Sequence, residues 1–97
     1  MTFMVFNSYF VDRAMQVLAD CKIDYYTSWD NAKGKGQGTE PHLGSGAYGS
    51  TNTVLMIAFK DEAALESLIR GIEGANREIT RPADRFRLFQ MPLERIV

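Results

Sequence analysis

The spacing of the apolar residues constrains the fold of this chain most, because it alternates between the period of a strand and that of a helix. Residues 2–7 and 51–60 are rich in apolar, aromatic and β-branched residues and contain neither glycine nor proline, which is typical of strands. Residues 23–29 and 86–92 indicate two further strands. The pattern predicts the order strand, helix, strand, strand, helix, strand.

The two predicted helices each carry one apolar face. The first covers about residues 11–22, and its apolar positions are Val11, Ala14, Met15, Leu18 and Cys21. The second follows the capping residue Asp61, and its apolar positions are Leu65, Leu68, Ile69 and Ile72. Because Gly71 and Gly74 weaken the end of this helix, we expect residues 76–84 to form a polar connection.

Four strands and two helices in this order indicate an α+β domain of the ferredoxin-like βαββαβ type. Its four-stranded antiparallel sheet is expected to carry both helices on one face, since this arrangement buries both apolar helix faces. A chain of 97 residues has room for one domain of ordinary size. We therefore expect one domain over residues 1–97.

The stretch at about residues 32–50 differs in composition from the rest of the chain. It holds six of the eight glycines, at positions 34, 36, 38, 44, 46 and 49, together with Pro41. A loop of this length inside a small domain is usually functional or disordered. We expect the function to depend on this loop, and residues 38–49 to be the most mobile part of the ligand-free protein.

The strands expected at residues 2–7 and 51–60 are apolar on both faces. In the latter, Leu55 and Ile57 alternate with Val54 and Met56, so large apolar side chains point to both sides of the sheet. Two helices cover only one face, and the other face needs another apolar surface. A second copy of the same sheet is the simplest cover, and we infer a homo-oligomer.

Composition and charge argue against several functional classes. The formal net charge of -1 lacks the cationic field that non-specific nucleic-acid binding requires, so no nucleic-acid partner is expected. A single cysteine, Cys21, cannot form an intrachain disulfide, and the opening residues lack a signal-peptide pattern, which favours the cytoplasm. No Ser-His-Asp or Cys-His set occurs at a recognisable spacing, and we expect no enzymatic activity.

Several segments, taken in order, resemble the PII signalling family. Residues 33–37, Lys-Gly-Lys-Gly-Gln, resemble the opening of the family's long loop, which then closes into residues 53–57. Residues 89–94 resemble its final Phe-x-x-Pro-x-Glu pattern. Residues 41–44 and 49–52 are similar to a divergent PII-like subgroup and not to the nitrogen regulators themselves.

This resemblance implies a homotrimer with ligand sites in the clefts between subunits. There an adenine nucleotide, AMP, ADP or ATP, would act as effector and reposition the loop, which would contact a transporter or an enzyme. No other cofactor is implied. The positions that match the family's nucleotide-binding residues are Ser28 near the adenine, Gly34, Gly36 and Gln37 near the phosphates, Thr80 at the start of a second loop, and Arg87 in place of a phosphate-binding lysine. Arg87 of one subunit and the loop base at Gly36 of its neighbour are therefore expected in one anion site.

Two alternatives remain open at this point. Glu40 and His42 lie in the loop, and three symmetry-related copies of His42 in a trimer could bind a metal, as in a metal-responsive PII-like protein linked to metal transport. No ligands occur at a metal-motif spacing, so no metal site is assigned. In the other alternative, the loop binds a partner protein without any ligand, and the chain is an adaptor.

Overall fold

The structure, a computed structural model, describes residues 1–33 and 51–97. The predictions for Gly34, Gly36, Gln37, Glu40 and His42, and for the mobility of residues 38–49, therefore concern residues outside the described part of the chain. The described elements are β1 (Thr2–Asn7), η1 (Ser8–Phe10), α1 (Val11–Asp20), β2 (Thr27–Ala32), β3 (Asn52–Ile57), α2 (Glu62–Arg77), η2 (Pro82–Asp84) and β4 (Arg87–Gln90).

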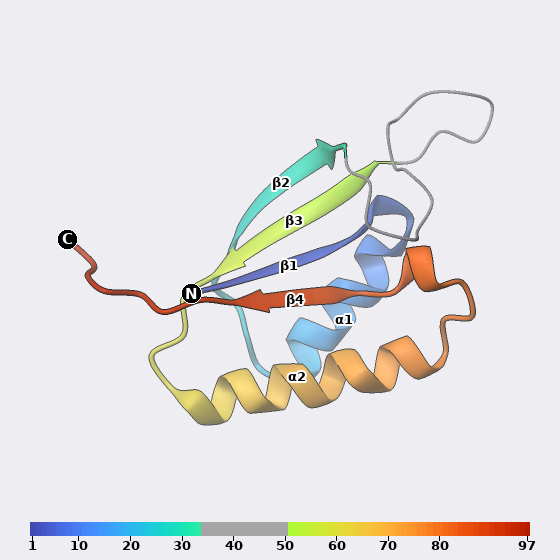
Figure 1. Ribbon diagram of the computed structural model, residues 1–97. Coiled ribbons are helices and arrows are strands. Elements are labelled where there is room, and N and C mark those ends of the chain that lie inside the picture. Colours follow the sequence, from blue (N-terminus) through green and yellow to red (C-terminus); the bar gives the residue numbers. More distant parts are fainter. Residues whose placement is uncertain (34–50) are drawn as a thin grey trace.

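The four strands form one antiparallel sheet in the order β2-β3-β1-β4. Both helices pack on the same face of this sheet, and the other face carries no helix of the described chain (Figure 1). The fold class is therefore confirmed as α+β with the ferredoxin-like βαββαβ order.

The core lies between the sheet and the helices. Alternate side chains of the two central strands are buried there: Thr2, Met4 and Phe6 of β1, and Thr53, Leu55 and Ile57 of β3. The helices contribute Ala14, Val17, Leu18, Leu68, Ile72 and Ala75. The buried Thr2 hydroxyl donates a hydrogen bond to the Ile57 carbonyl oxygen at 3.0 Å, so this polar group is satisfied inside the core.

The second strand begins four residues later than predicted, at Thr27. Lys22 has a positive φ of 58°, and its amide donates to the Ala19 carbonyl oxygen, while the Ile23 amide donates to the Leu18 carbonyl oxygen. These bonds form a Schellman motif, which ends α1 and satisfies its last carbonyl groups. Ile23 and Leu18 are both buried, so Ile23 serves the helix end and is not part of a strand.

Strands three and four are shorter than predicted because their partners end. β1 begins at Thr2, which is in register with both Ile57 of β3 and Gln90 of β4. Beyond Ile57, residues 58–60 have no neighbouring strand within the described chain with which to pair. Beyond Gln90, two hydrogen bonds continue the pairing: the Met91 amide donates to the Met1 carbonyl oxygen at 3.0 Å, and the N-terminal amine of Met1 donates to the Met91 carbonyl oxygen at 3.3 Å.

The second helix is longer than predicted and continues through both glycines to Arg77. The Asp61 cap is confirmed, since its carboxylate accepts a hydrogen bond from the Ala63 amide at 2.9 Å. At Gly71 an added Cβ would lie 2.9 Å from Cγ1 of Val17 on α1. Gly71 therefore allows the two helices to approach closely, and its cost in helix propensity is offset by this packing.

The two glycines of α2 provide a matched pair of variants. An added Cβ at Gly74 meets nothing nearer than the flexible Arg77 side chain at 3.6 Å, so Gly74→Ala should raise the free energy of unfolding by about 0.5–1 kcal/mol. Gly71→Ala gains the same propensity but overpacks against Val17 and Cys21, at a cost of about 1–3 kcal/mol. Urea denaturation should therefore show a lower midpoint for Gly71→Ala than for Gly74→Ala. Equal stabilisation by both variants would contradict the close approach of the helices.

Candidate functional site

One end of the sheet collects the segments that the sequence singled out. β1 and β2 end there, and β3 and β4 begin there, as Figure 1 shows. Asn7, Ala32, Asn52 and Arg87 mark this end, which we call the loop end because residues 34–50 connect β2 to β3 there.

Hydroxyl side chains connect three elements at the loop end. The hydroxyl oxygen of Thr53, a buried residue of β3, lies 2.9 Å from that of Ser8 in η1. The Asp30 carboxylate of β2 accepts longer hydrogen bonds from Thr53, at 3.5 Å, and from Ser28, at 3.4 Å. The Ser8 amide also donates to the Thr51 carbonyl oxygen at 2.8 Å. This network fixes the start of β3 against η1 and holds the end of β2 more weakly.

A β-bulge changes the course of β2 just before the loop. The register with β3 shifts between Trp29 and Ala32, and Asn31 has a positive φ of 59°. Asparagine adopts this left-handed conformation more readily than most residues. Its side-chain oxygen also accepts a hydrogen bond from the Thr51 hydroxyl at 3.4 Å. Bulges often re-aim a chain near functional sites, and this one sets the direction in which Lys33 leaves the sheet.

Asn76 fixes the beginning of β4. Its side-chain amide donates to the Phe86 carbonyl oxygen at 2.9 Å and accepts from the Phe86 amide at 2.7 Å. The Phe86 ring is buried against Phe6 and Phe10 in edge-to-face contacts. The residue before Arg87 is therefore held by both its backbone and its side chain. The sequence reasoning missed this contact, because Asn76 was expected in a polar connection.

The three predicted site residues in the described chain do not meet within one protomer. Ser28 is in register with Leu55 and so points to the helix side of β2, whereas Arg87 is in register with Val5 and points to the open side of β4. β2 and β4 are the two outer strands of the sheet. Thr80 is exposed in the turn after α2. A site that uses both Ser28 and Arg87 therefore needs a second protomer.

The loop end carries a cationic side chain that is open to solvent. Arg87 is exposed and forms no hydrogen bond or ion pair within residues 1–33 and 51–97, so its guanidinium group is available for a ligand. The described part of the chain holds no group of three His, Cys, Asp or Glu side chains arranged for a metal ion. It also contains no helix long and apolar enough to cross a membrane.

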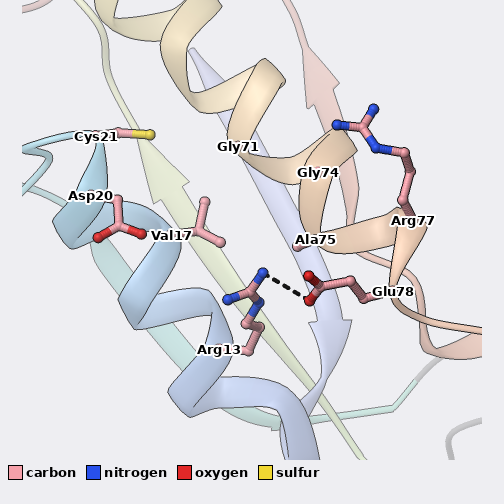
Figure 2. A pocket seen from close by; sticks show the side chains of 9 residues that line it. All are labelled: Arg13, Val17, Asp20, Cys21, Gly71, Gly74, Ala75, Arg77 and Glu78. Carbon is pink, nitrogen blue, oxygen red and sulfur yellow. Dashed lines mark hydrogen bonds and ion pairs between the residues drawn. The ribbon is translucent and has the colours of Figure 1, made fainter.

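A groove of about 380 Å³ lies between the two helices, on the side away from the open side of the sheet (Figure 2). Its floor includes Gly71 and Gly74, and the ion pair between Arg13 and Glu78, at 3.1 Å, lies across one part of it. Ser28, Thr80 and Arg87 do not line this groove. The candidate site is therefore the loop end and not the groove.

The face of the sheet without helices is mostly apolar. Its side chains alternate along the strands with the buried positions, and we call this set the open face: Phe3, Val5, Asn7, Thr27, Trp29, Ala32, Asn52, Val54, Met56, Arg87 and Phe89. Trp29 and Phe89 are 48% and 53% exposed. The prediction that both faces of the central strands are apolar is confirmed by these positions, and its consequence for assembly stays a prediction.

Replacing Asn76 by aspartate tests the clamp on β4. Asn76→Asp keeps the acceptor for the Phe86 amide but sets a carboxylate oxygen against the Phe86 carbonyl oxygen, so we expect a loss of about 1–3 kcal/mol in the free energy of unfolding. The control Gln16→Glu makes the same amide-to-acid change beside Asp20 on an exposed helix face. There the expected loss in the free energy of unfolding is about 0.5 kcal/mol. Chemical denaturation measures both. Similar small losses in the two variants would show that the Phe86 contact contributes little.

Comparison with known proteins supports the fold that the sequence predicted. No protein-family model matches the chain, and no curated protein matches it. A solved structure does match: CPII, a nitrogen regulatory PII-like protein from Thiomonas intermedia K12, bound to ADP, AMP and bicarbonate. The match has a TM-score of 0.60 and 17% sequence identity, and it covers 95% of this chain and 92% of CPII. The resemblance to PII proteins thus extends from short motifs to the whole described structure, and the chain has the fold of a PII-like protein.

Proposed function

We propose that this chain is a PII-like regulatory protein that binds an adenine nucleotide between subunits and signals through residues 34–50. The carrying observation is the fold shared with CPII over 95% of this chain, because that protein is bound to ADP, AMP and bicarbonate. The regulated target is proposed to be a transporter or an enzyme in the cytoplasm. The protein itself acts as a sensor and not as a catalyst.

The proposed nucleotide site combines two neighbouring protomers. One contributes β2, with Ser28 near the adenine, and the residues that follow Lys33 in the sequence: Gly34, Gly36 and Gln37. The other contributes Arg87 at the start of β4, whose guanidinium group suits a phosphate or a bicarbonate ion. Thr80 is assigned to the rim of the same site.

The position of the outer strands supports a shared site. β2 ends and β4 begins at the loop end, but two strands separate them within one protomer. A head-to-tail contact between protomers brings the β2 edge of one next to the β4 edge of the next, and such contacts form a ring when the rotation between protomers closes. We propose that this ring is a homotrimer, with three equivalent sites.

Calorimetry with ADP and AMP tests the site. Arg87→Ala removes a charged hydrogen-bond donor, so its affinity should fall by about 1.5–3 kcal/mol, or roughly ten- to a hundredfold. Gly36→Val should also weaken binding, because a branched side chain hinders backbone approach to a phosphate. Arg70→Ala, at an exposed position on α2, is the control and should bind like wild type. Equal affinities of wild type, Arg87→Ala and Gly36→Val would refute the site.

Light scattering tests the assembly. We expect a mass of about three times the 10.9 kDa of the chain. Met56→Asp should break the assembly, because each copy would bury an unpaired carboxylate on the open face. Ala63→Asp places the same charge on the exposed first turn of α2 and should leave the mass unchanged. A wild-type monomer at micromolar concentration would contradict both the ring and the shared site.

A further inference from the structure

One row of side chains crosses the whole open face near the loop end. Trp29 of β2 is in register with Val54 of β3, Val54 with Val5 of β1, and Val5 with Arg87 of β4. Directly opposite residues of antiparallel strands share a face, so these four side chains lie on one side of the sheet. An indole ring thus ends the row at one edge, and a guanidinium group ends it at the other.

Trp29 is an exposed aromatic residue without a polar partner among the described residues. Its exposed fraction is 48%, and its indole nitrogen forms no hydrogen bond within the described ranges. It is also the only tryptophan of the chain. Tryptophan combines a large apolar area with the strongest aromatic attraction for a cation, so this edge of the row suits a positively charged group.

Arg87 is the only charged member of the open face as defined above. No carboxylate within residues 1–33 and 51–97 pairs with it. Covering the apolar side chains of this face would also remove water from the guanidinium group. This removal costs free energy unless the covering surface offers the group a partner. The cover must therefore be apolar over most of its area and must attract a cation at one point.

A second copy of the open face meets both requirements when it is placed head to tail. In a twofold dimer formed edge to edge, the edges that meet are alike, β2 with β2 or β4 with β4, so indole meets indole or two guanidinium groups repel. In a ring the β2 edge of each protomer meets the β4 edge of the next, and the two ends of the row are complementary. We propose that the protomers associate in this way, with Trp29 of one stacked on Arg87 of the neighbouring protomer.

This stacking would also orient Arg87 for its ligand, a step that rests on the proposed function. A guanidinium group is planar, stacks through its face and donates hydrogen bonds through its edge. Stacking on Trp29 therefore leaves the N–H groups free for an anion and restricts the motion of the side chain. Trp29 is thus a positioning residue that acts through Arg87.

Fluorescence and a double-mutant cycle test the stacking in the intact protein. Arg87→Met keeps much of the side-chain volume but removes the charge, and the association constant should fall about two- to thirtyfold for each interface between protomers. The emission of Trp29 should shift to the red, and the indole should become more accessible to acrylamide. Arg87→Lys keeps the charge without the planar stack and should give an intermediate result, and Arg70→Met on exposed α2 should resemble wild type.

The cycle separates direct stacking from a general weakening of the packing. In the Trp29→Leu background, Arg87→Met should change the association constant less than twofold, because the partner of the charge is already absent. Trp29→Phe, a milder variant, should keep part of the coupling. Additive effects of the two substitutions, or Trp29 emission that Arg87→Met leaves unchanged, would overturn the proposal.

The double-mutant cycle and the nucleotide calorimetry can fail independently of each other. Coupling between Trp29 and Arg87 without any binding of ADP or AMP would support the stacking and refute the proposed function. Nucleotide binding together with additive effects in the cycle would refute the stacking and leave the shared site in place.

Discussion

The structure depends on the alternation of side chains along its two central strands. β1 and β3 bury Met4, Phe6, Leu55 and Ile57 against the helices, and this burial of apolar surface is the main source of stability. The same strands direct Phe3, Val5, Val54 and Met56 to the opposite side. Because the two helices are already used on one face, the folded chain carries a mostly apolar second face, and this face is the basis of the proposed assembly.

The antiparallel order of the sheet places the segments of the proposed site. With β3 and β1 in the middle, β2 and β4 are the edges; β2 ends and β4 begins at the loop end. A single protomer thus presents Ser28 and Arg87 at separate edges and on separate faces of the sheet. The topology itself therefore favours a ligand site that two protomers share.

Sequence patterns predicted the fold class and the order of the elements because hydrophobic periodicity is local and strong here. They missed features that depend on a specific contact between two residues. Ile23 has the composition of a strand but completes the end of α1 with Leu18. Gly71 looks like a helix breaker until Val17 of α1 is placed against it. The motif resemblance named Ser28, Thr80 and Arg87, but only the register shows that Arg87 and Ser28 point to opposite sides.

The two sides of the proposed site are held with unequal strength. β4 starts from Phe86, whose backbone makes hydrogen bonds of 2.7 and 2.9 Å to Asn76, and whose ring is buried. The end of β2 is held by side-chain hydrogen bonds of 3.4–3.5 Å that involve Asp30 and Asn31. Long hydrogen bonds between exposed groups exchange with water at little cost in free energy, whereas short bonds to a buried strand do not. A ligand bound between protomers would therefore meet a firmly held start of β4 on one side and an adjustable end of β2 on the other. That strand end leads directly into residues 34–50, so the adjustable side is also the one connected to the proposed signalling segment.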